Sequence, residues 1–239
     1  MIMETKKGLS AGRIIAWLGL AVLAGGYIFV AGRTNTCSAC AAITQLAGVG
    51  PVSTPRAEYP MSPLQVGESI PEGMLRNEQM EEVDLAALIH RKPTVLIFYR
   101  GGWCPYCNRQ LAALSDIEQE LRGAGFQLLA ISPDRPELLR QKEAMKESPY
   151  MLLSDSSMDL SRRFGIAFQV EDELVEKYKN SYKIDLEHDS GYTHHLLPHP
   201  SVFIIDTDGK IRFQYTNEDY KVRLEPEKIM EAVRRIQAE

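Results

Sequence analysis

Two cysteines separated by two residues follow a tryptophan in the stretch YRGGWCPYCNRQ, residues 99–110. A Cys-x-x-Cys pair can bind zinc, form a structural crosslink or serve as a redox centre. Zinc requires four ligands, and the histidines at 188, 194, 195 and 199 are candidates by count alone. A disulfide across so short a loop would constrain little chain entropy, which disfavours a purely structural crosslink.

The residues around the pair favour redox chemistry. The apolar run TVLIFY, residues 94–99, predicts a strand buried on both faces, and a helical pattern follows until Gly123. Cys104 then lies near the helix N-cap, with Pro105 in the first turn, where backbone N–H groups favour a thiolate. Cys107 comes one turn later on the same face. We therefore expect an exposed, acidic nucleophile at Cys104 and a buried, less acidic resolving thiol at Cys107.

Further elements alternate along the chain in a way that positions this pair. We expect a hairpin and short helix over 74–89, strands at FQLLAIS and MLLSD, a helix from Pro136 through Lys146, a short helix ending near Gly165, a hairpin over SVFIIDTDGKIRFQY and a last helix from Pro226 to Ile236. This order predicts an α/β fold with a central mixed sheet flanked by helices. The pair lies where a central strand passes into a helix, the usual place for a site in such sheets.

A longer set of motifs resembles a known family. The stretches FYRGGWCPYCNRQL, ISPD, LPHPSVFIIDTDGKI and DYKVRLEPE resemble the peroxiredoxin-like branch of the alkyl hydroperoxide reductase/thiol-specific antioxidant (AhpC/TSA) family, from about residue 66 onward. CPYC alone also matches the glutaredoxin tetrapeptide. The resemblance implies a thioredoxin-like fold, no cofactor, and a redox disulfide between Cys104, the attacking or peroxidatic cysteine, and Cys107, the resolving one. It also places Pro200 opposite the pair.

Two positions depart from the family pattern. Peroxiredoxins have a threonine three residues before the peroxidatic cysteine and a proline four residues before that, where this chain has Gly101 and Ile97. The threonine hydroxyl helps to hold peroxide in the family. Arg100 either lends positive charge to the site or is a surface arginine at a strand end. We expect Trp103 to lie partly in the core and partly at the rim of the site.

These features lead to three hypotheses about function. The first is a membrane-anchored thiol–disulfide oxidoreductase that uses the C-P-Y-C redox pair. The alternative is a thiol-dependent peroxidase that reduces hydroperoxides through a sulfenic acid at Cys104. A non-catalytic zinc-binding or scaffold module is a further alternative. For the enzymes, the expected partners are protein disulfides or thiols, or an external thiol reductant.

The N-terminal region predicts a membrane anchor. Residues 14–31 form an uncharged apolar run of 18 residues, just long enough to span a bilayer, although a cleaved signal peptide is an alternative. Basic residues before this run predict a cytoplasmic segment 1–13, and residues 32–65 a Pro/Gly-rich tether. We therefore expect a single-pass protein of the bacterial inner membrane, with the domain at 66–239 on the periplasmic or extracytoplasmic side. The pair Cys37 and Cys40 is either a second redox pair or an idle disulfide.

Composition and charge limit the remaining possibilities. Hydrophobic residues make up 44% and charged residues 25% of the 239 residues, as in ordinary globular proteins. The net charge is −5 and gives no basic footprint for nucleic acid. Within 171–199, EDELVEKYKNSY predicts a helix, whereas GYTHHLLPHP predicts an irregular segment whose histidines are solvated rather than metal ligands.

Overall fold

A mixed sheet of seven strands forms the centre of the structure, a computed structural model that describes residues 59–141, 146 and 148–239. Across the sheet the strands lie in the order β2 (Glu82–Asp84), β1 (Met74–Arg76), β5 (Met151–Ser154), β4 (Gln127–Ser132), β3 (Thr94–Phe98), β8 (Ser201–Ile205) and β9 (Ile211–Thr216). β3, β4 and β5 are parallel, and the other neighbours pair antiparallel. The predicted central mixed sheet is confirmed.

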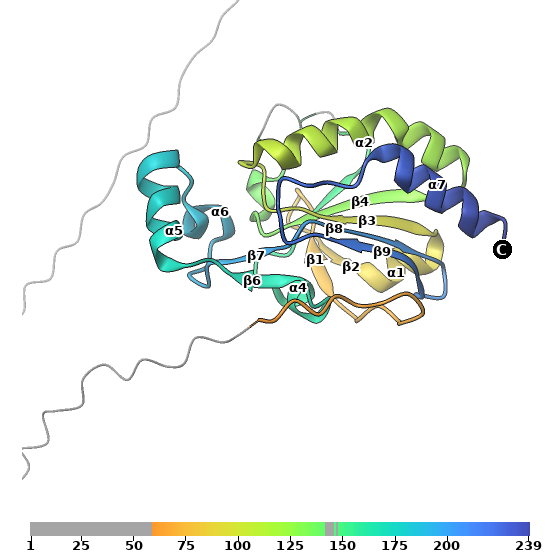
Figure 1. The fold of residues 1–239 in the computed structure, drawn as a ribbon, viewed down its shortest axis with the longest axis horizontal. Helices are drawn as coiled ribbons and strands as arrows, with labels where there is room; N and C mark the ends of the chain where they lie inside the picture. Colours follow the sequence, from red (N-terminus) through yellow and green to blue (C-terminus); the bar gives the residue numbers. More distant parts are fainter. Residues whose placement is uncertain (1–58, 142–145, 147) are drawn as a thin grey trace, which may run out of the picture. The chain divides into compact units, whose positions relative to one another are not determined.

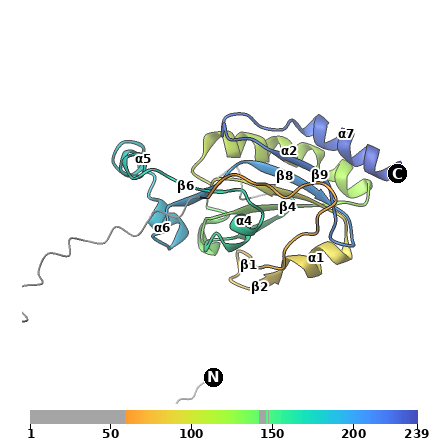
Figure 2. The ribbon, with the colours of Figure 1, turned by 60° about the horizontal axis from the view of Figure 1, so that its bottom comes forward.

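Strand β3 is buried on both faces, as its continuous apolar sequence predicts. Val95 and Ile97 point into one hydrophobic cluster, and Leu96 and Phe98 point into the other. α2 (Pro105–Gly123) and α7 (Pro226–Gln237) cover the first face, and α1 (Leu85–Arg91) and α4 (Asp159–Arg163) cover the second (Figures 1 and 2). Complete burial of such a side chain stabilises a fold by about 1.5–3 kcal/mol, so both layers hold β3 firmly.

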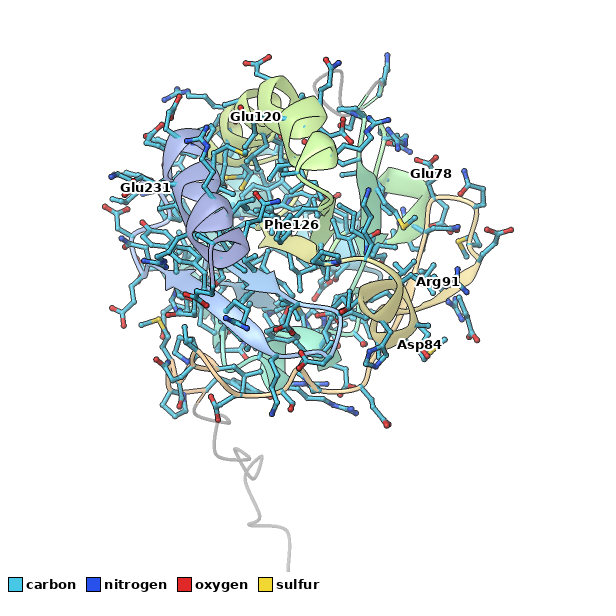
Figure 3. All side chains as sticks on the ribbon, turned by 90° about the vertical axis from the view of Figure 1, so that its right-hand side faces the viewer. Glu78, Asp84, Arg91, Glu120, Phe126 and Glu231 are labelled. Carbon is cyan, nitrogen blue, oxygen red and sulfur yellow. The ribbon has the colours of Figure 1, made fainter. Side chains whose placement is uncertain are left out.

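The view from the end of the sheet shows how α2 and α7 pack on its first face. In Figure 3, Phe126 lies beneath α2 and α7, where the chain turns from α2 into β4. Its side chain is only 4% exposed. Glu120 and Glu231 lie on the outer surfaces of these helices, and Glu120 forms an ion pair with Arg234 of α7. Helix α2, which carries the cysteine pair, is thus fixed both to the sheet and to α7.

The segment before β8 is an ordered subdomain beside the sheet (Figure 1). β6 (Ala167–Gln169) and β7 (Leu196–Pro198) form a two-stranded antiparallel sheet, and α5 (Asp172–Lys177), the π-helical turn η3 (Tyr178–Tyr182) and α6 (Leu186–Ser190) lie between them. The predicted helix in EDELVEKYKNSY is confirmed. The prediction that GYTHHLLPHP is irregular is wrong at Leu196–Pro198, because β6, a distant partner in sequence, supplies the backbone hydrogen bonds of β7.

Two other segments differ from the sequence pattern. The helix predicted from Pro136 begins as a single 3-10 turn, η2 (Pro136–Leu138), whose N-cap Arg135 makes no side-chain capping bond. The described end of the predicted tether lies against the domain, because the Ser62 N–H donates to the carbonyl of Gly165 at 2.9 Å. Gly165 permits this approach, since a Cβ there would lie 1.9 Å from the Ser62 carbonyl oxygen.

Several predictions fall outside the described residues. These are the membrane span 14–31, its cytoplasmic flank, most of the tether and the pair Cys37 and Cys40. Over residues 59–141, 146 and 148–239, no helix combines the length and the apolar character needed to cross a bilayer.

Candidate functional site

The redox pair lies at the start of α2. Cys104 is the N-cap residue, with extended backbone angles, and Pro105 occupies the first turn, as predicted. The Cys104 Sγ accepts a hydrogen bond from the Cys107 backbone N–H at 3.4 Å, so the sulfur acts as the capping group of the helix. This position holds the sulfur against free N–H groups and the positive end of the helix dipole.

The surroundings divide the two thiols into an acidic and a non-acidic partner. The Cys107 thiol hydrogen-bonds to Cys104 and, together with the Cys107 N–H and the charges of Arg100 and Arg223, lowers the pKa of Cys104 to about 6, although burial opposes this. Burial, and then the interaction with Cys104, raises the pKa of Cys107. At neutral pH the reactive thiolate is therefore on Cys104, as the helix position predicts.

The prediction of an exposed nucleophile is wrong. Cys104 is only 1% exposed and Cys107 is fully buried. Arg223, from the segment between β9 and α7, accounts for part of this cover, since its Nη2 lies 3.9 Å from Cys104 Sγ and 3.3 Å from Cys107 Sγ. The same guanidinium donates to Gln110 Oε1 at 3.3 Å. Arg223 lies within the stretch DYKVRLEPE, which carries part of the family resemblance, but its contact with the sulfurs was not predicted.

Arg100 is a buried part of the site and not a surface arginine. It is 3% exposed, and its guanidinium carbon lies over the rings of Trp103, Tyr178 and Tyr220, at 5.0, 5.8 and 4.3 Å from their centroids. It also donates a hydrogen bond to the Tyr178 hydroxyl. Within the described residues Arg100 forms no ion pair with a carboxylate, so its charge acts on the cysteine pair without local neutralisation. Tyr178 and Tyr220 lie in stretches quoted above, EDELVEKYKNSY and DYKVRLEPE, but their contacts with Arg100 were not predicted.

The loop before Cys104 requires glycine at position 101. Gly101 has a φ of +138°, and an added Cβ would lie 2.5 Å from Trp103 Nε1 and 2.8 Å from Asp134 Oδ1. A threonine cannot occupy this backbone. Asp134, the last residue of ISPD, is 3% exposed and fixes the loop: its carboxylate accepts hydrogen bonds from the Gly102 N–H at 2.7 Å and the Ser132 hydroxyl at 3.1 Å. This role was not predicted from the sequence.

Pro200 lies at the same end of the sheet as the redox loop. β8 pairs antiparallel with β3, with Ser201 opposite Phe98, so Pro200 comes level with the residues that lead into the loop. Its neighbour His199 stacks on Phe168 at 4.5 Å, and burial lowers the pKa of His199. Pro200 therefore lies at the end of the sheet that carries the redox loop.

The other histidines have partners of their own. The ring nitrogens of His188, His194 and His195 lie near Asp189, the Ser156 carbonyl and Glu187, respectively. The described part of the chain contains no group of three or more His, Cys, Asp or Glu side chains that could hold a metal ion. The zinc hypothesis therefore receives no support from the described histidines.

Comparisons with known proteins agree with this geometry. A profile of the AhpC/TSA family matches residues 66–214. The putative peroxiredoxin bcp of Haemophilus influenzae is 36% identical over 106 residues, 44% of this chain and 68% of that protein. Peroxiredoxin Bcp of Escherichia coli K12 is 27% identical over 161 residues, 67% of this chain and 90% of that protein. The crystal structure of peroxidoxin BcpB from Mycobacterium tuberculosis has a TM-score of 0.56 at 19% identity, over 73% of this chain and 97% of that chain. The likeness in structure confirms the thioredoxin-like fold.

Proposed function

The chain belongs to the AhpC/TSA family and is an oxidoreductase, and we propose that it is a thiol peroxidase in which Cys104 attacks hydroperoxides. The observation that carries the proposal is the setting of Cys104 Sγ. This sulfur caps α2, has a pKa lowered to about 6 by the Cys107 thiol and its other neighbours, and lies 3.9 Å from the Arg223 guanidinium. Two of the three hypotheses drawn from the sequence are redox reactions, and the peroxiredoxin relatives favour peroxide reduction over disulfide exchange.

In the first step, the Cys104 thiolate attacks the terminal oxygen of the hydroperoxide. A sulfur–oxygen bond forms, the O–O bond breaks, and the departing alkoxide or hydroxide takes up a proton, which leaves Cys104 as sulfenic acid. Negative charge develops on the departing oxygen. The guanidinium groups of the buried Arg100 and the half-buried Arg223 supply N–H donors and positive charge. They replace the threonine hydroxyl of the family, because the backbone at Gly101 does not accommodate a threonine.

In the second step, Cys107 resolves the sulfenic acid. Its sulfur attacks Cys104 Sγ, an S–S bond forms, and the hydroxyl leaves as water after taking the proton of the Cys107 thiol. The two thiols lie within one turn of α2 and hydrogen-bond to each other, which suits this step. Arg223 Nη2, 3.3 Å from Cys107 Sγ, stabilises the thiolate that the buried resolving cysteine must form.

Thiol–disulfide exchange is the second candidate function. It is favoured by the same pair, because an acidic thiolate and a resolving thiol one turn away are sufficient for exchange. In that reaction the Cys104 thiolate attacks a disulfide of another protein instead of a peroxide. Both functions end in the Cys104–Cys107 disulfide, so this bond cannot separate them.

Trapping the first product on Cys104 separates the two functions. The full-length Cys107→Ser variant, which keeps a hydroxyl donor beside Cys104, is reduced and given one equivalent of hydrogen peroxide together with dimedone, a trap for sulfenic acid. Trypsin releases residues 101–109, which contain the pair but not Cys37 or Cys40. We expect dimedone on Cys104 in this peptide. The Cys104→Ser control should carry none on Cys107.

The opposite result would establish exchange. If peroxide gives no dimedone adduct on Cys104, while oxidised protein disulfides give a mixed disulfide with the same variant, the peroxidase proposal fails. If neither product forms and Cys104 of this variant remains reduced, both redox proposals fail.

We also propose that residues 14–31 anchor the chain in the inner membrane, with residues 66–239 on the extracytoplasmic side. The proposal rests on the apolar run and on the basic residues before it. Alkaline phosphatase and a fluorescent protein that matures only in the cytoplasm, each fused after residue 60, test it. Phosphatase activity without fluorescence is expected, and the reverse pattern would place the domain in the cytoplasm.

A further inference from the structure

A recess lined by cations lies beside the redox pair, at the start of α2. It encloses about 140 Å³ between this helix and the segment that leads from β9 into α7, which passes the same end of α2 in Figure 1. Its polar and aromatic lining comes from Tyr106, Arg109, Gln110, Lys221, Arg223 and Glu225. Three positive charges against one negative charge therefore line a recess in a chain whose net charge is −5.

The three cations of this recess, Arg109, Lys221 and Arg223, form no ion pair with a carboxylate of the described residues. The contacts of Arg109 and Lys221 are with the faces of Tyr106 and Tyr220, at 5.7 and 5.8 Å. Cations held on aromatic rings keep their charge for an anionic ligand.

Arg223 links the recess to the sulfurs and retains an unused donor. Its Nη2 lies 3.3 Å from Cys107 Sγ, whereas its Nε is buried and has no hydrogen-bond partner among the described residues. A buried donor without a partner is unfavourable unless a ligand satisfies it. The recess thus combines free positive charge with an unsatisfied donor next to the reacting sulfurs.

The recess on the other side of the cysteine loop has the opposite character. Its volume is about 280 Å³, and its lining sets the carboxylates of Asp134, Asp185 and Asp189 against the single amine of Lys183. An anionic ligand is repelled there and attracted to the cationic recess. The two sides of the loop therefore distinguish between ligands by charge.

We propose that the cationic recess binds the carboxylate groups of a low-molecular-weight thiol, which serves as the reductant of the Cys104–Cys107 disulfide. The inference rests on the proposed function, since it names the class of electron donor for the same site. The thiolate of the reductant attacks Cys104 Sγ, the S–S bond breaks, and Cys107 leaves as a thiolate that Arg223 stabilises. A second molecule attacks the sulfur of the first, releases the small disulfide and restores the Cys104 thiolate; two thiols are oxidised for each protein disulfide reduced.

The test starts from the oxidised protein, so it does not depend on peroxide. Full-length protein carrying the preformed Cys104–Cys107 disulfide is mixed with glutathione, a thiol with two carboxylates, or with its diethyl ester, in which both are neutral. Samples are quenched by alkylation, and the rate is corrected for the thiolate fraction of each reductant. The state of the pair is read from tryptic peptide 101–109, or from peptide 101–122 in proteins that carry Arg109→Gln. We expect glutathione to react faster than the ester with the wild type.

The decisive variant removes two charges of the recess without touching the sulfurs. Arg109→Gln combined with Lys221→Gln should lower the rate with glutathione by about five- to tenfold, because two solvent-screened attractions to its carboxylates are lost. The rate with the ester, which has no carboxylate, should fall by less than about twofold. The matched control, Arg91→Gln with Arg235→Gln, removes the same net charge from exposed positions outside the recess and should react as the wild type.

Three results would overturn the proposal. Equal slowing of glutathione and its ester in the Arg109/Lys221 variant would mean that the recess does not recognise carboxylates. Equal rates for all proteins would mean that it binds no thiol. A variant that loses reduction by a dithiol protein but keeps that by glutathione would assign the surface to a protein reductant. Failure of the peroxidase function is seen separately, in the dimedone experiment.

Discussion

Replacing Arg223 by methionine tests how the charge of this arginine controls the reactive thiol. Arg223 Nη2 lies 3.9 Å from Cys104 Sγ. Two unit charges about 4 Å apart attract by about 1 kcal/mol in water and about 4 kcal/mol at an effective dielectric constant of about 20. Arg223 is half-buried, so solvent screening keeps the effect near the lower limit. About 1.4 kcal/mol changes a pKa by one unit.

The expected result follows from that energy. In Arg223→Met the pKa of Cys104 should rise from about 6 to about 7, because the thiolate loses one of its cationic partners. At pH 6 the thiolate fraction then falls from about one half to about one tenth, so alkylation slows by about fivefold. At pH 9 both proteins are fully ionised at Cys104 and should react alike.

The assay is the rate of iodoacetamide labelling of peptide 101–109 in the reduced full-length protein, measured between pH 4 and pH 10. Arg223→Lys is the matched control, because it keeps the positive charge, and its profile should stay close to that of the wild type. An unchanged profile in Arg223→Met would refute the electrostatic reasoning. A rate lost equally at every pH would show that Arg223 acts on access to the sulfur and not on its pKa.

Three further outcomes follow from the structure. Asp155→Ala should destabilise the fold by about 2–4 kcal/mol in urea unfolding, because buried donors, including the hydroxyl and N–H of Ser161, lose their acceptor. Burial raises the pKa of Asp155 to about 6, so the wild type should lose stability relative to Asp155→Asn as pH rises from about 4 to about 6; a parallel pH dependence would contradict this. Gly101→Ala should lower both stability and peroxide reactivity, because its Cβ collides with Trp103, and wild-type values would refute the strained loop. Limited alkylation at neutral pH should label Cys104 before its partner, and the reverse order would exchange the two roles.

The placement of the cysteine pair could be predicted because its signals are local. The apolar run of β3, Pro105 at the helix start and the helical spacing after Cys107 all lie within about 25 residues of one another. Strand burial, capping and helix periodicity act over such distances. The central sheet, the redox helix and the separation of the two thiols into acidic and non-acidic partners were therefore accessible from sequence.

The rest of the site depends on contacts between distant segments. Arg223 lies 119 residues after Cys104 and Tyr178 lies 78 residues after Arg100, so no local pattern joins either pair. The burial of Cys104 has the same origin, since a helix N-terminus read alone is exposed. Strand β7 was not predicted, because a helical segment separates it in sequence from its partner β6.

The most direct test of the account is the reaction of the fully reduced, full-length protein with hydrogen peroxide in stopped-flow mixing at pH 7. Buried donors aimed at a developing oxyanion each accelerate a reaction by on the order of a hundredfold. With Arg100 and Arg223 beside Cys104, we expect a rate constant at least a hundredfold above that of a free thiolate of the same pKa, and its loss in Cys104→Ser. A rate constant equal to that of the free thiolate would contradict the peroxidase account and leave disulfide exchange as the function of the pair.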